Sequence, residues 1–181
     1  MARLYFIRHG KAAAGFDGHP DPGLDETGRA QAAKRADRLN ALPPMPIVSS
    51  PLLRARETAD PLCNLWQCEK LIVPQIAEIP SPMTDLKARS LWLGGVMRET
   101  WANLDTNLHD WRKAMIDYLC GIDTDTVLFS HFIAINVAVG YANNDEHMIS
   151  FRPDNASCTL LDNSSGLEVI ELGGQASTHI N

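Results

Sequence analysis

The sequence lacks an excess of positive charge, and this excludes two common classes of partner. Its 181 residues include 16 lysines and arginines against 22 aspartates and glutamates, so the formal net charge is −6. Nucleic acids and anionic membrane surfaces both select basic faces. We therefore expect neither as a partner. A small anionic substrate remains compatible with an acidic protein, because a local cluster of arginines is enough to bind phosphate.

Cysteine is scarce and long apolar runs are missing. The four cysteines have no CxxC spacing and lack the density of a disulfide scaffold. No segment is apolar over the length that crosses a bilayer, and the N-terminus does not show the charged region, apolar stretch and cleavage site of a secretory leader. These absences predict reduced thiols in a cytoplasmic protein with no membrane partner. No pattern indicates an oligomeric state.

The chain has the length for one buried core and is too short for two ordinary domains, so residues 1–181 are expected to form a single domain. Strands are expected over Leu4 to Arg8, Ile47 to Val48, Leu71 to Val73, Thr126 to Phe129, Ala156 to Leu161 and Leu167 to Leu172. Helices are expected from Thr27 to about Leu42, from Ser50 with a kink or split at Pro61, and over Asp85 to Leu104, Asn107 to Cys120 and Ile133 to Tyr141. The last two strands carry a hairpin signal. The pattern predicts an α/β three-layer sandwich with a mostly parallel central sheet, helices on both faces and an antiparallel edge near the C-terminus.

The first strand ends abruptly in Arg8-His9-Gly10. In open α/β sheets, ligands gather outside the carboxyl ends of the strands. An imidazole there can act as a base or a nucleophile, and an adjacent guanidinium has the forked donors that suit phosphate. Gly10 would let the chain turn sharply and bring backbone N–H groups near an anion. This tripeptide alone is a weak motif.

Two more strand ends deliver cations or potential cations. Arg54 falls on the first turn of the helix after the second strand, where free N–H groups also favour an anion. His131 follows Ser130 at the end of the fourth strand. Together with Arg8 and His9, these side chains are expected to meet at one edge of the sheet.

The sequence resembles the histidine phosphatase superfamily, also called phosphoglycerate mutase-like. The matching segments occur in the family's order and cover most of the chain. They are Arg8-His9-Gly10, the stretch from Leu24 to Ala32, Ser49 through Ala59, Ala77-Glu78 and Ser130-His131.

The resemblance implies a role for each matching side chain. His9 would be the nucleophile that becomes phosphorylated, and Arg8, Arg54 and His131 would hold the phosphoryl oxygens. Glu78 would donate a proton to the leaving group. It implies a small phosphorylated substrate and phosphomonoester hydrolysis through a phosphohistidine, with no metal or organic cofactor required in principle.

The sequence departs from the family's commonest pattern at two places. A glycine and a second acidic residue usually follow the family's glutamate, whereas this chain continues with Ile79-Pro80-Ser81 and reaches its next carboxylate at Asp85. Asp85 is therefore the alternative to Glu78 as proton donor. Phe132 replaces the glycine that usually follows the second histidine, where its ring would narrow the pocket or pack behind it.

Other polar residues are weaker candidates for the site. Asp17 and His19 lie in a loop expected to flank it, but no second pair at metal spacing accompanies them, so we expect no metal site. The residues after the acid cover the site in many relatives. Arg89, Arg98, Arg112 and His109 are therefore secondary candidates for contacting the remote end of a substrate, and Asn136 is either structural or pocket-lining.

Three other functions are compatible with the same residues. A phosphoglycerate-type mutase would return the phosphoryl group to a sugar acid, and a protein phosphohistidine phosphatase would need less help from Glu78. A non-catalytic phosphate-binding module belongs to a different class, and it would have no need of the nucleophile His9. The short stretch after Glu78 and the small total length favour the phosphatase.

Overall fold

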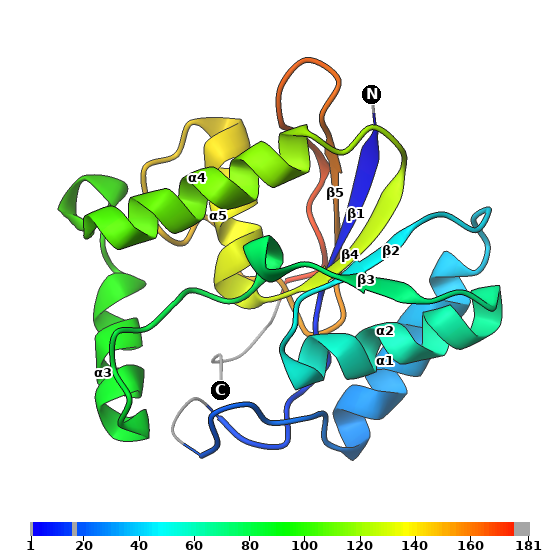
Figure 1. Ribbon diagram of the computed structural model, residues 1–181, viewed down its shortest axis with the longest axis horizontal. Helices are drawn as coiled ribbons and strands as arrows, with labels where there is room; N and C mark the ends of the chain where they lie inside the picture. The colour runs from blue at the N-terminus through cyan, green and yellow to red at the C-terminus, as the bar shows by residue number, and fades with distance from the viewer. Residues whose placement is uncertain (1, 16–17, 176–181) are drawn as a thin grey trace.

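A six-stranded mixed sheet forms the centre of the molecule (Figure 1). The computed structural model describes residues 2–15 and 18–175. The strand order is β3-β2-β4-β1-β5-β6. Four strands run parallel, while β5 and β6 form the antiparallel edge that the hairpin signal predicted. The strands are β1 (Arg3–Arg8), β2 (Ile47–Ser49), β3 (Lys70–Ile72), β4 (Thr126–Ser130), β5 (Cys158–Asp162) and β6 (Glu168–Glu171).

Helices cover both faces of the sheet, as expected. The α-helices are α1 (Glu26–Leu39), α2 (Leu53–Trp66), α3 (Leu86–Val96), α4 (Thr106–Cys120) and α5 (Phe132–Asn143). Short 3₁₀ turns η1 (Pro74–Ile76) and η2 (Trp101–Asn103) precede and follow α3. Figure 1 shows α1 and α2 against one face and α4 and α5 against the other, while α3 lies farther out. The single-domain α/β fold is thus the predicted three-layer arrangement.

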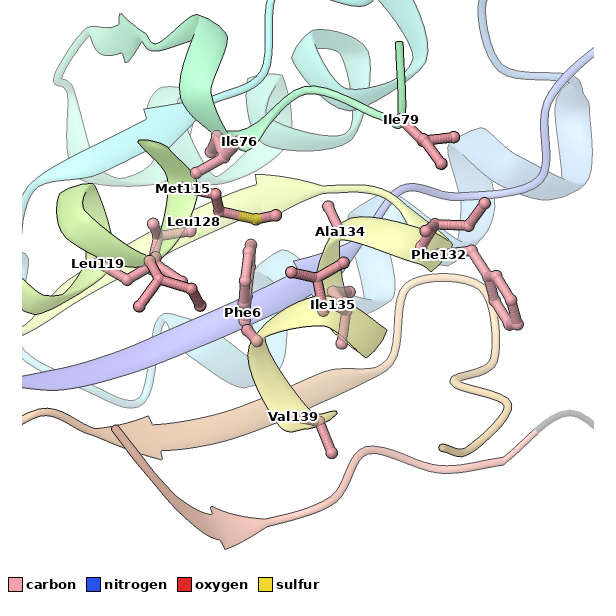
Figure 2. Packing of buried hydrophobic residues seen from close by; sticks show 14 of the residues in the cluster. Phe6, Ile76, Ile79, Met115, Leu119, Leu128, Phe132, Ala134, Ile135 and Val139 are labelled. Atoms are coloured by element: carbon pink, nitrogen blue, oxygen red, sulfur yellow. The ribbon is translucent and has the colours of Figure 1, made fainter. Parts of the chain in front are cut away.

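Alternating side chains of β1 reach two separate cores. Leu4 and Phe6 pack with residues of α4 and α5, whereas Ile7 packs with residues of α1 and α2. Figure 2 shows Phe6 among Met115, Leu128 and Ile135. Successive residues of a strand point to opposite faces, so an apolar run that is buried on both sides marks a central strand. This double burial fixes the register of β1, and with it the position of the residues that follow.

Two helices differ from their expected limits. Helix α1 begins at Glu26, one residue before Thr27, because the carboxylate of Asp25 caps it by accepting a hydrogen bond from the N–H of Gly28 at 2.7 Å. Helix α2 runs unbroken through Pro61, where a kink or split was expected. The buried neighbours Ala59 and Leu62 pack into the core beside that proline, and this packing outweighs the lost backbone hydrogen bond.

The segment after the third strand is less helical than its sequence pattern indicated. Helix α3 ends at Val96 and is followed by a turn and η2 instead of continuing to Leu104. In the described part of the chain, no helix combines the length and apolar character that crossing a bilayer would need.

Candidate functional site

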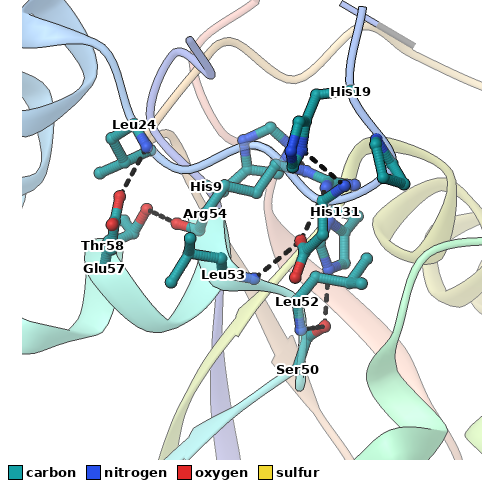
Figure 3. Close-up of polar contacts among 12 residues, drawn as sticks. His9, His19, Leu24, Ser50, Leu52, Leu53, Arg54, Glu57, Thr58 and His131 are labelled. Atoms are coloured by element: carbon teal, nitrogen blue, oxygen red, sulfur yellow. Dashed lines mark hydrogen bonds and ion pairs between the residues drawn. The ribbon is translucent and has the colours of Figure 1, made fainter. Parts of the chain in front are cut away.

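The side chains predicted from the strand ends converge at the carboxyl edge of the parallel strands. Arg8, His9 and Arg54 line one pocket, and the rings of His9 and His131 lie 5.2 Å apart between centroids. Figure 3 shows Arg54 and His131 beside His9. All four side chains are buried although each is polar or charged. Since buried polar groups are costly unless they are paired or used, this concentration marks a candidate functional site.

The hydrogen bonds of His9 identify its tautomer. Its Nδ1 lies 2.7 Å from the carbonyl oxygen of Gly10, and a carbonyl only accepts, so Nδ1 carries the proton. Its Nε2 accepts a hydrogen bond from Nε of Arg54 at 3.2 Å. Both contacts assign the neutral imidazole with its lone pair on Nε2. That nitrogen faces the guanidinium that would hold an anionic substrate.

Electrostatics keep His9 neutral. Burial lowers the pKa of His9 well below its usual value, and the charges of Arg54 and Arg8 lower it further. The pKa of His131 is lowered in the same way, first by burial and then by Arg54. A neutral imidazole retains the lone pair that nucleophilic attack requires.

Arg8 is fixed from two sides. Its Nη1 donates to the carbonyl oxygen of Pro153 at 2.8 Å, and its guanidinium carbon lies 5.1 Å from the ring centroid of Phe132. Its Nε has no partner within the described residues. Burial lowers the pKa of Arg8 to about 10, so the group stays charged at neutral pH. Phe132 therefore lines the pocket and also contacts Arg8.

Arg54 sits on the first turn of α2 and meets a carboxylate that the sequence reading did not single out. Asp21 accepts a hydrogen bond from the N–H of Leu53 at 2.9 Å, and its Oδ1 lies 3.7 Å from Nη1 of Arg54. Asp21 thus occupies the anion-favouring end of α2. The loop was expected to flank the site, but nothing local distinguishes a capping aspartate between two prolines from an ordinary turn residue.

Ser50 orients His131. Its Oγ lies 2.7 Å from Nε2 of His131 and accepts a hydrogen bond from the N–H of Leu52 at 3.2 Å. A hydroxyl that accepts from Leu52 can still either donate to Nε2 or accept from it, so this contact fixes the orientation of the ring and is compatible with both tautomers. The Nδ1 atom is buried and has no partner within the described residues. Ser50 was expected only to cap α2, and Leu52 holds the cap position instead.

Glu78 and Asp85, the two candidates for the acid, lie in different surroundings. Glu78 is buried, accepts a hydrogen bond from the N–H of Ile79 at 3.1 Å, and has one carboxyl oxygen, Oε2, without a partner in the described part of the chain. Burial raises its pKa, although Arg54 and Arg8 oppose the shift. Asp85 is exposed and caps α3 through the N–H of Ala88 at 2.9 Å. Of the two, only Glu78 combines burial with proximity to the arginines.

Gly10 serves the site by close packing rather than by presenting its N–H to an anion. That N–H donates to the hydroxyl of Thr58 at 3.0 Å. A Cβ on Gly10 would lie 2.5 Å from the carbonyl oxygen of Gly28. Thr58 in turn donates to the carbonyl oxygen of Arg54 at 2.6 Å, so it joins α2 to the chain after His9. Thr58 lay within the segment that resembles the family, but no role had been inferred for it.

The secondary candidates fall into two groups, those that line the pocket and those that do not. Arg89 and His19 line the pocket, and Nη1 of Arg89 lies 3.5 Å from the carbonyl oxygen of Pro20. Arg112 instead lies over the ring of Trp101 at 4.4 Å, away from this pocket. The other secondary candidates also lie elsewhere: His109 packs against Trp101, Arg98 is exposed, Asn136 bonds to backbone atoms of Phe132, Ser150 and Phe151, and Asp17 lies outside the described residues.

Comparison with known proteins gives a family for the first part of the chain. Residues 4–83 match the model of the histidine phosphatase superfamily, branch 1. A protein of Photorhabdus laumondii subsp. laumondii described as probable phosphoglycerate mutase GpmB is 30% identical over 121 residues, which are 65% of this chain and 51% of that protein. The chain therefore spans about half the length of the curated relatives it matches.

Solved structures agree on the fold. A protein described as mycobacterial hydrolase 1 superposes with a TM-score of 0.76 at 21% identity, over 97% of this chain and 99% of its own. A mycobacterial glucosyl-3-phosphoglycerate phosphatase in complex with VO3 gives a TM-score of 0.72 at 23% identity, over 98% and 100% of the two chains. These likenesses extend the shared architecture across nearly the whole molecule.

Proposed function

We propose that this chain, whose residues 4–83 match the model of the histidine phosphatase superfamily, is a phosphomonoester hydrolase of that family that works through a phosphohistidine on His9. The observation that carries this proposal is the state of His9. Its Nδ1 proton is held by the carbonyl of Gly10, while its Nε2 lone pair faces the guanidinium of Arg54. A neutral imidazole held in one tautomer is suited to in-line attack on phosphorus.

The cations around His9 supply the place for the phosphoryl group. Arg54 exchanges its bond to Nε2 for a bond to a phosphoryl oxygen when the substrate binds. Arg8 contributes its Nε, and His131 contributes its Nδ1 in the tautomer that carries the ring proton there; both atoms are unpartnered in the described part of the chain. Phosphoryl transfer has a loose transition state, so positioning and charge stabilisation by such donors provide most of the rate.

Glu78 completes the first step. Nε2 of His9 forms a bond to phosphorus while the bond from phosphorus to the ester oxygen breaks, and the carboxyl proton of Glu78 passes to that oxygen. Its burial supports this role, because a carboxyl group must have a raised pKa to hold a proton near neutrality.

In the second step, water hydrolyses the phosphohistidine. The carboxylate of Glu78 takes a proton from water, the water oxygen bonds to phosphorus, and the bond from Nε2 to phosphorus breaks. This releases phosphate and restores neutral His9 and protonated Glu78. The substrate class is therefore a small phosphorylated molecule whose leaving oxygen needs a proton.

The decisive experiment is intact mass spectrometry after brief mixing with an aryl phosphate. A transient, acid-labile gain of one phosphoryl group is expected, and it should be absent in His9→Ala. No adduct and no phosphate release, with inorganic phosphate still bound, would contradict hydrolysis and favour a phosphate-binding module.

A mutase is the second candidate, because the curated relative matched here is described as a probable phosphoglycerate mutase. It would use the same phosphohistidine but return the group to a sugar acid. Incubation with a phosphoglycerate distinguishes the two: phosphate release supports the hydrolase, whereas isomerisation without release supports the mutase.

A further inference from the structure

A second groove lies beside the loop that supports His9. One wall is the face of α1 that carries Lys34, Arg35 and Arg38, and the other wall is formed by residues 154–157. It shares no lining residue with the pocket that contains Arg8 and His9. The groove is therefore a separate place for a ligand.

The groove concentrates positive charge in an acidic protein. Among its lining residues the cations outnumber the carboxylates, since Asp154 alone opposes Lys34, Arg35 and Arg38. Within residues 2–15 and 18–175 none of these cations is in an ion pair. Lys34 and Arg38 are also four residues apart on one helix, a like-charge spacing that weakens a helix. An anion between them would remove that repulsion.

Arg35 is held in place for such an anion. It is half-buried, and its Nε donates to the carbonyl oxygen of Ala156 at 2.6 Å. The charge of Arg38 adds to burial in lowering the pKa of Arg35. Its Nε is anchored while its terminal nitrogens make no hydrogen bond within the described part of the chain. A fixed guanidinium with free terminal donors is suited to bidentate contact with phosphate.

The groove is connected to His9 by two short links. The N–H of Ala156 donates to the carbonyl oxygen of His9 at 3.3 Å, and Nδ2 of Asn155 donates to the same oxygen at 3.1 Å. Arg35 bonds to the carbonyl oxygen of the same residue, Ala156. A ligand that moves Arg35 therefore acts on the residues that hold the backbone of His9.

We propose that this groove binds a small phosphorylated molecule and that its occupancy alters the reactivity of His9 through Asn155 and Ala156. The binding itself is independent of the reaction at His9. The effect on reactivity rests on the proposed function.

Isothermal titration calorimetry with inorganic phosphate tests the binding. The wild-type chain should bind at two sites. The double variant Lys34→Ala, Arg38→Ala should weaken one of them at least about tenfold, as expected for the loss of two charge-assisted contacts. Arg54→Ala should weaken the other and leave the groove intact. The matched control is Arg56→Ala, Lys87→Ala, which removes the same charge from exposed positions outside both pockets. One site in the wild type, or two unchanged sites in the groove variant, would overturn the inference.

Kinetics test the effect on His9. With an aryl phosphate as substrate, added phosphate should change kcat of the wild type by about twofold or more in addition to competing at the active pocket. In the groove variant it should compete only. Identical inhibition patterns in the two proteins would refute the coupling. Absence of hydrolysis by a wild-type chain that still binds phosphate at two sites would instead refute the proposed function and leave the groove site standing.

Discussion

Nε of Arg54 donates a hydrogen bond to Nε2 of His9 at 3.2 Å, so the cation predicted to hold the phosphoryl group also contacts the nitrogen predicted to attack it. The pair forms a resting state in which the lone pair is occupied but not protonated. Substrate binding must exchange this contact for one between the guanidinium and phosphate.

Replacing Arg54 should have two effects. Arg54→Ala is expected to lower kcat/KM by about 10²–10³-fold, the loss typical of one donor to a developing anion. It should also raise the pKa of His9, because the charge of Arg54 helps to lower it. NMR titration of the His9 ring measures the second effect without turnover. Arg56→Ala, an exposed arginine on the same helix, should change neither value. An unchanged His9 pKa in Arg54→Ala would contradict the assigned contact.

Glu78→Gln should slow turnover most for substrates whose leaving group needs a proton. For an alkyl phosphate we expect a loss of about 10²–10⁴-fold in kcat, the range of general acid catalysis, and a much smaller loss for a nitrophenyl phosphate, whose leaving group needs no proton. Asp85→Asn is the matched control, since asparagine also caps helices well and should keep α3 and activity intact. Full alkyl phosphatase activity in Glu78→Gln, with a loss in Asp85→Asn, would transfer the role to Asp85.

The negative charge of Asp21 should weaken the binding of anionic substrates. In Asp21→Asn the side-chain oxygen can still accept from the N–H of Leu53, but the negative charge beside Arg54 is removed. We expect KM for a phosphate monoester to fall by about threefold to tenfold with kcat little changed, because one like-charge repulsion is lost near the surface. The difference should shrink at high ionic strength. A rise in KM would mean that Asp21 helps to position Arg54 instead.

The close packing around Gly28 predicts that a larger residue there destabilises the fold. A Cβ there would lie 2.1 Å from the carbonyl oxygen of Lys11, which is backbone and cannot move aside freely. Gly28→Ala should therefore lower the free energy of unfolding by about 1–3 kcal/mol and reduce activity, since it displaces the chain after His9. Gly94→Ala within α3 meets nothing within 4 Å and should be neutral or stabilising. Urea denaturation of both variants compares them directly, and equal stability would contradict the packing argument.

Stability should depend on pH through the buried histidines. The pKa values of His9 and His131 are lowered in the folded chain, so below pH about 6.5 the unfolded chain takes up protons that the folded chain does not. The free energy of unfolding should then fall with decreasing pH, by up to about 1.4 kcal/mol per pH unit for each histidine. Glu78 acts with the opposite sign, because its raised pKa costs stability as the pH rises above its unfolded value.

Urea denaturation between pH 8 and 5 measures this dependence. His9→Asn should reduce the slope below pH 6.5, because one of the two histidines no longer titrates. An identical slope in the variant would show that His9 is not held neutral by the fold.

Strand ends and the family motif were enough to predict which side chains of the candidate site lie together. Arg8, His9, Arg54 and His131 follow short apolar strands, and parallel strands bring their carboxyl ends to one edge. The sheet with its antiparallel edge followed from the same runs. The positioning roles of Asp21 and Ser50 could not be found in this way, since each depends on a contact between segments far apart in the sequence.

The errors in the expected elements have physical causes. The prediction of a split at Pro61 considered only local backbone chemistry, while packing of α2 against the sheet decided the outcome. The start of α1 was placed at Thr27 although Asp25, with its stronger capping carboxylate, stood two residues before it. Burial distinguishes Glu78 from Asp85 as the candidate acid, and no spacing of carboxylates reveals burial.

The bond from the hydroxyl of Ser130 to the carbonyl oxygen of Ile76, at 2.7 Å, has a consequence for how this fold can diversify. It ties the segment that delivers Glu78 to the strand that delivers His131, before the chain departs into α3. Residues 80–91 contain no buried side chain, whereas Leu93, Val96 and Trp101 further along belong to the core. We therefore expect changes within residues 80–91 to leave the acid in place. Arg89 of this segment lines the pocket. Substitutions on that side of Ile79 are therefore expected to change substrate preference more than they change the reaction at His9.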